Sequence, residues 1–420
     1  MKKNLPNILF LSLAILNFVY FFAGFYYQHD FSNGGKIDFE HFYNNLLLFK
    51  DYNFFEIPWE KYESTTLPIY YLFLKYIIPR DNIFIFKFFG FSISLIIVLL
   101  IYINFKIKYN LRKFNINLFL LSTIPLISSS YRTDAFYGME KNFGLLFLTL
   151  GIIFFNLKNK NIKFLYFAIF FSSLTFYTKQ IYCFFPIIVY FAILNFKDIF
   201  SNKNILYSSL FLTFLVPSLY FFYKWDGLVS PVAAHRILKI NFYNIPNILG
   251  QFLIFLTPFF IFTVIYKKNI ANFFKFSSHK LFFLFLFYLI YIYFFIDIKF
   301  QNFGGGPAYK LALLLGDKYF SKIIYLSITF VGLIFVILFC RLSKEFFIYF
   351  FFTSGIIFFA DNIFFGYLDP LAFLIIIFFF PFKFSIISSN KFVLINIFYF
   401  LTLHISYFFY YSYYIGNIIR

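Results

Sequence analysis

The chain has 420 residues, of which 62% are hydrophobic, 28% aromatic and only 13% charged. No soluble domain can bury that much apolar surface, so the composition excludes a soluble enzyme or binding module. The net charge of +19 does not indicate a nucleic-acid partner, because the basic residues lie between apolar runs, where they orient a chain in a bilayer. We therefore expect an all-α polytopic membrane protein that contacts the lipid bilayer and no nucleic acid.

Apolar runs suited to membrane spans recur along the chain. A span needs about 20 apolar residues. The first run is too long for a cleaved signal peptide and no small-residue cleavage site follows it, so we expect a retained anchor. About 13 transmembrane helices are expected, near residues 6–27, 83–104, 117–131, 143–157, 164–178, 181–195, 205–222, 247–266, 281–296, 323–340, 346–360, 370–381 and 392–412.

The segment from Ser64 to Pro79 is a poor candidate for a span. It has 16 residues, contains Pro68 and ends at a second proline. We expect a helix that lies at the membrane interface instead, as part of the first outer loop. The expected organisation is a single membrane domain over residues 1–420, with longer outer loops at 28–82, 223–246 and 297–322.

The distribution of charge predicts the orientation. With the segment at the interface, the inner connections are the N-terminus and residues 105–116, 158–163, 196–204, 267–280, 341–345 and 382–391. They hold 19 of the 36 Lys and Arg residues but only 2 of the 17 acidic residues. This bias agrees with the positive-inside rule and places the N-terminus in the cytoplasm.

Acidic residues are concentrated in the first outer loop. Seven of the 17 lie between Gln28 and Glu63. Asp38 and His41 are three residues apart and share a face if the segment is helical. An ordinary solvated surface is the alternative interpretation for any one of these acids.

Later outer loops carry further candidates. Asp134 lies in the turn "YRTDAFYG", although an acid there can also cap a helix. Lys179 and Gln180 lie at the tip of a hairpin, where a lysine can contact a phosphate or extend to the interface. The loop "WDGLVSPVAAHRILK" places two cations and an imidazole close together, as an anion site or as a basic face against lipid headgroups. These residues are His235, Arg236 and Lys239.

Several stretches resemble one family of membrane enzymes. "IDFEHFYNN", "WEKYESTTLPIYY", "SYRTDAFYG", "YTKQIY" and the loop from Trp225 to Asn247 are similar, in this order, to motifs of GT-C glycosyltransferases. Within that class they resemble the dolichyl-phosphate-glucose-dependent alpha-1,2-glucosyltransferase family. The chain departs from the family at Lys179, where the family has Arg, and at Ile181 and Tyr182, where it has Thr and Asn.

The resemblance implies transfer of a hexose, such as glucose, from a polyprenyl- or dolichyl-phosphate sugar to a lipid-linked or envelope glycan. Such chemistry needs a carboxylate base outside the cytoplasm, for which Asp38 is the first choice and Glu40 the second. It needs no metal and no cofactor, because the donor is itself the substrate. The resemblance implies a bacterial inner membrane, or the endoplasmic reticulum in a eukaryote. The expected substrate-binding residues are His41, Trp59, Thr65, Thr66, Asp134, Lys179, Gln180, Asp226, His235, Arg236 and Lys239.

Two other classes remain open at this point. A polysaccharide polymerase or ligase, or a flippase of lipid-linked sugars, also uses basic outer loops. A non-catalytic component of envelope assembly needs no carboxylate base. Few ionisable residues lie inside the apolar runs, which counts against an ion-coupled carrier.

The orientation can be tested by labelling single cysteines in intact cells or sealed vesicles. We expect positions 38, 235 and 361 to react with a membrane-impermeant reagent from the outer face. Labelling of position 235 only from the cytoplasmic face would contradict the predicted topology.

Overall fold

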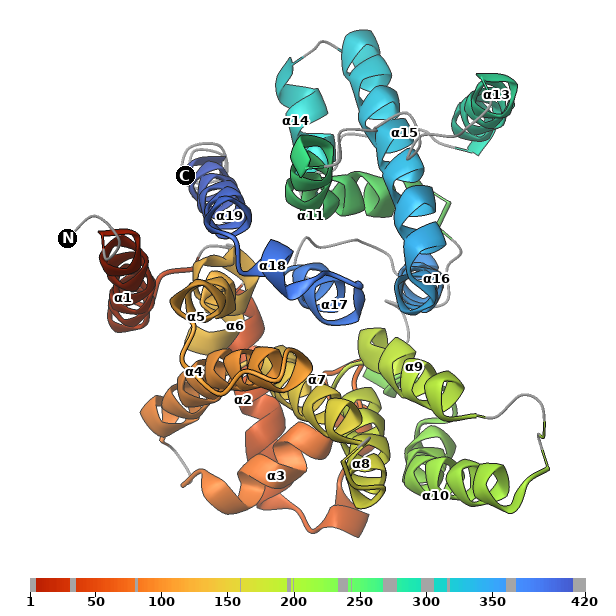
Figure 1. Cartoon of the computed structure of the whole chain (residues 1–420). Helices are drawn as coiled ribbons and strands as arrows, with labels where there is room; N and C mark the ends of the chain where they lie inside the picture. The colour runs from red at the N-terminus through yellow and green to blue at the C-terminus, as the bar shows by residue number, and fades with distance from the viewer. Residues whose placement is uncertain are drawn as a thin grey trace. The chain divides into compact units, whose positions relative to one another are not determined.

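The computed structural model describes residues 5–30, 35–79, 82–158, 160–194, 198, 200–232, 241–242, 244–266, 278–295, 306–315, 318–359 and 368–410. In these ranges the chain is all-helical and contains no strand. It divides into two compact units (Figure 1). The first comprises Met1–His235, Lys383–Val393 and Phe400–Arg420, and the second comprises Arg236–Phe382 and Leu394–Tyr399.

The first unit contains ten α-helices of the N-terminal half. They are α1 (Leu5–Tyr26), α2 (Gly35–Asp51), α3 (Ile69–Ile77), α4 (Ile83–Lys108), α5 (Ile116–Ser122), α6 (Ser129–Phe136), α7 (Glu140–Leu157), α8 (Lys163–Thr178), α9 (Phe184–Ile193) and α10 (Asn202–Trp225). The 3-10 helices are η1 (Phe54–Glu56), η2 (Trp59–Lys61), η3 (Ile124–Ile127) and η4 (Gln180–Cys183). Helix α18 (Phe384–Ile387) and both ends of α19 (Asn390–Tyr410) also belong to this unit.

Among the described residues, the second unit contains six helices of the C-terminal half and the middle of α19. They are α11 (Asn244–Tyr266), α13 (Ser278–Phe295), α14 (Gly306–Leu315), α15 (Lys318–Leu342), α16 (Lys344–Phe358) and α17 (Leu371–Phe379). Helices α11 and α15 pack so closely that a Cβ added to Gly332 would lie 2.2 Å from the carbonyl oxygen of Leu249.

Seven helices are long and apolar enough to cross a membrane among the described residues: Pro6–Tyr26, Ile83–Lys108, Glu140–Leu157, Asn202–Trp225, Asn244–Phe262, Phe320–Leu342 and Asn390–Phe409. The chain is therefore a multi-pass integral membrane protein. The expectation of about 13 spans is wrong. Each of the seven coincides with an expected run. Among the described residues, five of the other six runs form shorter or interrupted helices, and the run 281–296 falls in the 18-residue α13.

Helix breaks explain why the expected number was too high. The run 117–131 is divided into α5, η3 and α6, because Pro125 cannot continue a helix and Ser128 caps a new one by accepting from the Tyr131 N–H at 3.3 Å. Helix α8 has 16 residues, and at 1.5 Å per residue it is about 24 Å long, less than the roughly 30 Å of a hydrocarbon core. The shorter elements in the other runs are α9, α16 and α17.

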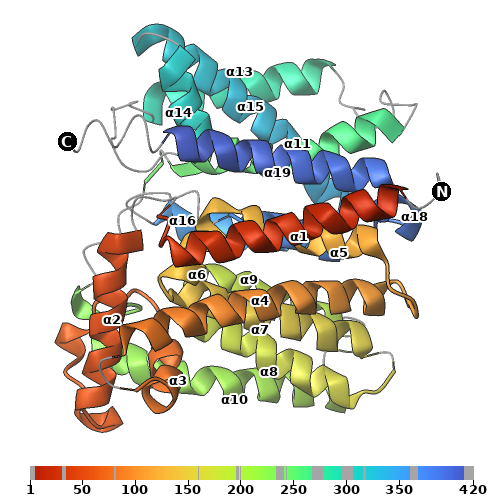
Figure 2. The ribbon, with the colours of Figure 1, turned by 90° about the vertical axis from the view of Figure 1, so that its left-hand side faces the viewer.

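One end of the first unit is covered by the segment between the first two long helices. Figure 2 shows α1, α4, α7, α8 and α10 roughly side by side, with α2 and α3 across one end. Helix α3 has nine residues, too few to span a membrane, as the sequence predicted for this segment. The polar residues considered below lie in this covered end.

Helices α4 and α6 meet at two glycines in that end. A Cβ on Gly90 of α4 would lie 2.6 Å from the Gly138 Cα, and Gly138 itself has φ +65° after the end of α6. Only glycine adopts that backbone conformation without strain. The approach therefore fixes α6, and the polar turn that follows it, against α4.

Gly90→Ala should lower the free energy of unfolding by about 1–3 kcal/mol. The added Cβ would meet the backbone of Gly138, which cannot move aside as a flexible side chain can. Denaturant unfolding of purified protein in detergent would measure it. Gly355→Ala is the matched control, since a Cβ there meets nothing within 4 Å. Equal stability of the two variants would contradict the close approach of α4 and α6.

Candidate functional site

Helix α2 places Asp38 beside α6. A Cβ on Gly35 would lie 2.6 Å from the Thr133 Cγ2 atom, so the first turn of α2 lies directly on α6. Phe39 packs on Tyr137 with ring centroids 6.2 Å apart, and the Lys87 Nζ lies 4.5 Å from the Phe39 ring centroid. These contacts fix the turn that carries Asp38, whose charge is also favoured at a helix N-terminus.

The surroundings of Asp38 favour its protonated form. Solvent reaches the side chain, but the protein around it displaces enough water to raise the pKa of Asp38 above its ordinary value. The charges of Asp134 and Asp30 also raise this pKa, whereas those of Lys179 and His41 lower it. A carboxylate with a raised pKa is a stronger proton acceptor than an ordinary aspartate.

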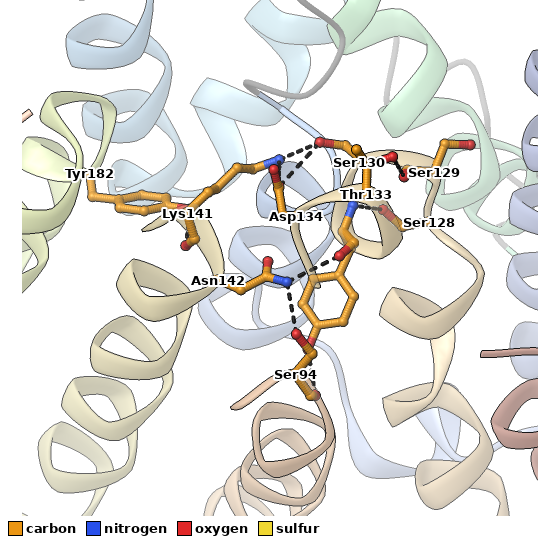
Figure 3. A network of polar contacts seen from close by, with 10 residues as sticks. Ser94, Ser128, Ser129, Ser130, Thr133, Asp134, Lys141, Asn142 and Tyr182 are labelled. Atoms are coloured by element: carbon orange, nitrogen blue, oxygen red, sulfur yellow. Dashed lines mark hydrogen bonds and ion pairs between the residues drawn. The ribbon is translucent and has the colours of Figure 1, made fainter. Parts of the chain in front are cut away.

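Asp134 is paired with Lys141. Figure 3 shows the Lys141 side chain extended toward Asp134 and Ser130; its Nζ lies 3.0 Å from Asp134 Oδ2 and donates to Ser130 Oγ at 2.6 Å. Both charged side chains are buried. Asn142, the next residue of α7, donates to Ser94 Oγ at 2.8 Å and so ties the first turn of α7 to α4. Lys141 was not among the predicted site residues.

A third carboxylate lies next to this pair. Glu140, 2% exposed, accepts a hydrogen bond from Thr66 Oγ1 at 2.8 Å. The Ser64 and Thr66 hydroxyl oxygens are 2.9 Å apart, and Ser230 Oγ donates to the Ser64 carbonyl at 2.8 Å. Three segments that are separate in the sequence therefore meet at Glu140. The prediction of Thr66 selected a residue of this network but not Glu140, although an acid followed by a lysine at the start of an apolar run was a visible signal.

Lys179 comes from the corner between α8 and η4. Its backbone is extended (φ −161°, ψ 130°) between the two helices. The corner is held on α7, because a Cβ on Gly144 would lie 2.5 Å from Thr178 Oγ1 and the Tyr182 hydroxyl donates to the Lys141 carbonyl at 3.2 Å. In this position the charge of Lys179 acts on both Asp38 and Glu140.

The other residues predicted in the first loop have varied surroundings. His41 Nδ1 contacts Glu63 Oε2 in a partly exposed ion pair. Trp59 is buried among aromatic rings, with its ring centroid 5.6 Å from that of Phe221 and 6.1 Å from that of Trp225. This environment makes it a packing residue that joins the first loop to the end of α10. Glu40 is exposed and Thr65 is half-buried.

Residues predicted in the later loops are described only in part. Asp226 is exposed and ends α10 in the left-handed conformation (φ 51°). The structure brings Asp38, Asp134 and Lys179 together with Thr66. Positions outside the described residues are His235, Arg236, Lys239 and the side chain of Gln180, as well as Asp361 of the topology prediction.

The group defined by Asp38, Asp134, Glu140, Lys141 and Lys179 is called the charge cluster below. It contains three carboxylates and two ammonium groups, so it has an excess of acidic groups. Among the described residues, no group of three or more His, Cys, Asp and Glu side chains is placed to hold a metal ion. Comparisons with known protein families, with curated proteins and with solved structures find no match.

Replacing Lys141 by Met should destabilise the fold by about 3–5 kcal/mol, because Asp134 would remain buried without its cation. The free energy of unfolding in detergent would measure the effect. The double variant Asp134→Asn/Lys141→Met should recover much of the loss, since no uncompensated charge remains. A double variant as unstable as Lys141→Met alone would show that the pair does not provide the stabilisation.

Proposed function

We propose that this chain is a polyprenyl-phosphate-sugar-dependent hexosyltransferase that acts on the non-cytoplasmic face of the membrane. The observation that supports it most is the position of Asp38. It is a solvent-accessible carboxylate with a raised pKa, on which the charge of Lys179 acts, and it lies at the end of a bundle of apolar helices. A base for a sugar hydroxyl needs these properties, because the hydroxyl must lose its proton as it attacks.

In the proposed reaction Asp38 accepts the proton of the acceptor hydroxyl. The acceptor oxygen forms a bond to the anomeric carbon of the donor sugar, while the bond from that carbon to the phosphate oxygen breaks. The polyprenyl phosphate leaves with the bonding electron pair. Attack from the side opposite the phosphate inverts the anomeric carbon. Glucose and an alpha-1,2 linkage are the sugar and bond that the family resemblance implies.

Cations must stabilise the negative charge that develops on the leaving phosphate. The charge cluster has more acids than bases, and Arg236 and Lys239 stay candidates from the sequence alone, because they lie outside the described residues. Lys179 remains a further candidate, because its charge acts on Asp38, the proposed base. This arrangement needs no metal ion as a counter-charge.

A lipid-borne donor suits the covered end of the first unit. Tyr26 and Tyr223, at the ends of two long helices, are 80% and 81% exposed, and Phe55 and Tyr76 of the first loop are 79% and 83% exposed. Exposed aromatic rings are favoured at the headgroup level of a bilayer. We place α2 and α3 at the outer interface, beside the phosphate of the donor.

The test is incubation of purified protein with a panel of polyprenyl-phosphate hexoses and lipid-linked or envelope glycans as acceptors, followed by mass analysis. Transfer should occur and should fall by about 10²–10⁴-fold in Asp38→Asn, the usual contribution of a placed base. The rate for the unaltered chain should decline as the pH falls through the pKa of Asp38, at a higher pH than for an ordinary aspartate.

Glu40→Gln is the matched control in the same helix. Near-normal transfer by Asp38→Asn together with loss in Glu40→Gln would make Glu40 the base. Full activity of both variants would contradict a base in the first loop. No transfer from any donor would contradict the transferase proposal.

A further inference from the structure

Helix α6 presents a hydroxyl and a carboxylate one turn apart. Ser130 and Asp134 are four residues apart and therefore lie on one face of the helix. Their side chains meet there, with Ser130 Oγ 3.5 Å from Asp134 Oδ2. In Figure 3 the Lys141 side chain reaches both of them from α7. The three side chains form one compact polar group, in which Ser130 is only half-buried.

The two oxygens of the Asp134 carboxylate have different surroundings. Oδ2 lies 3.0 Å from Lys141 Nζ, and it is also the oxygen that faces Ser130. Oδ1 accepts no hydrogen bond from any described residue, in a side chain that is still 10% exposed. An ionised carboxylate can accept several hydrogen bonds, so Oδ1 is placed to accept one from a ligand.

The charge of this group favours an uncharged ligand. Lys141 balances Asp134, so the pair carries no net charge. A phosphate needs an excess of cations, and the Asp134 carboxylate would repel it. A hydroxyl group can donate to a carboxylate oxygen, and it can either donate to or accept from a serine hydroxyl. A ligand with two neighbouring hydroxyl groups therefore matches Asp134 and Ser130 better than an anion does.

Stability alone does not account for the pair. Removing two charges from water costs about as much as their attraction returns, so an apolar pair of similar size is often as stable. Lys141 lies in the first turn of α7, which is long and apolar enough to cross a membrane. Ionisable side chains in such helices are rare and generally serve binding or transport. The pair is therefore expected to have a role besides packing.

Helix α2 brings the proposed base close to this group. The first turn of α2 lies on Thr133 of α6, and Phe39, one turn farther along, packs on Tyr137. Asp38 stands between these two contacts on α2, and Asp134 stands between them in the α6 segment. A sugar held by its hydroxyl groups at Asp134 would thus have its ring near Asp38.

We propose that Ser130 and Asp134 bind two neighbouring hydroxyl groups of the donor hexose, and that Lys141 is a positioning residue that holds Asp134 from its buried side. This inference rests on the proposed function, whose donor is a polyprenyl-phosphate hexose. Asp134 Oδ1 accepts the proton of one hydroxyl, and Ser130 Oγ bonds to the next. The sequence predicted Asp134 as a substrate-binding residue, whereas Ser130 and Lys141 enter only through these contacts.

The experiment measures binding without transfer. Purified protein in detergent, with no acceptor present, is titrated with a short-chain polyprenyl-phosphate glucose and with analogues that each lack one ring hydroxyl, and calorimetry gives each Kd. In the unaltered protein, loss of the hydroxyl bound by the Asp134 carboxylate should weaken binding by about ten- to a hundredfold. Loss of the neighbouring hydroxyl, bound by Ser130, should weaken it by about two- to tenfold, because that hydrogen bond involves no charge.

Variants assign each hydroxyl to its residue. Ser130→Ala should abolish the smaller penalty and retain the larger one, whereas Ser130→Thr keeps the hydroxyl and should retain both. The double variant Asp134→Leu/Lys141→Met should abolish the larger penalty, because an analogue loses nothing where the protein no longer offers a partner. Ser92→Ala is the matched control, since the Ser92 hydroxyl donates to the Phe88 carbonyl within α4 at 2.8 Å. It should leave every Kd unchanged.

Two results would overturn the inference: equal binding of all the analogues by the unaltered protein, or both penalties retained in the folded variants. Bare polyprenyl phosphate that is weakened by Ser130→Ala as much as the hexoside would also overturn it, because the site would then contact the phosphate. Should the double variant fail to fold, Ser130→Ala and Ser130→Thr decide.

The outcome for the sugar site is separate from that for the transferase. If the penalties follow the expected pattern but no hexose is transferred, the transferase proposal fails while the sugar site stands. Transfer without any hydroxyl-specific penalty would leave the transferase proposal standing and remove Ser130 and Asp134 from the binding site.

Discussion

The buried ion pair between Asp134 and Lys141 is the interaction on which the covered end of the first unit depends. Charges at the end of an apolar bundle lose much of their hydration and must be compensated locally. Here the compensation joins α6 to α7 through Asp134, Ser130 and Lys141, and Asn142 extends it to α4. The turn between α6 and α7 is thereby fixed in one position.

This anchor determines where the remaining polar groups can lie. The first turn of α7 presents Glu140 to Thr66, and the same turn supports the corner that carries Lys179. The first turn of α2 lies on α6 through Gly35 and thus brings Asp38 to the same place. Carboxylates and lysines are thereby collected at the covered end, where we propose that a lipid-borne substrate reacts.

The number of spans illustrates what apolar runs can and cannot predict. Composition was sufficient to predict an all-helical membrane protein, because a chain so rich in apolar residues has few other ways to satisfy its backbone hydrogen bonds in a bilayer. Composition was not sufficient to predict the number of membrane spans. A run such as 117–131 is continuous in hydrophobicity, yet Pro125 and the cap at Ser128 divide it, and only helix length distinguishes such a run from a span.

The sequence by itself determined the class of the protein, the positions of its seven long helices and the concentration of acids between the first two of them, because these properties follow from local composition and periodicity. It also selected Asp38, Thr66, Asp134 and Lys179, which the structure brings together. Only the tertiary structure decided their partners. Lys141 neutralises Asp134 across the turn between α6 and α7, Glu140 joins the site through Thr66, and Trp59 packs in an aromatic core with Trp225 of α10. Burial and pairing decide what a charged side chain can do, and neither can be read from the residues beside it in the sequence.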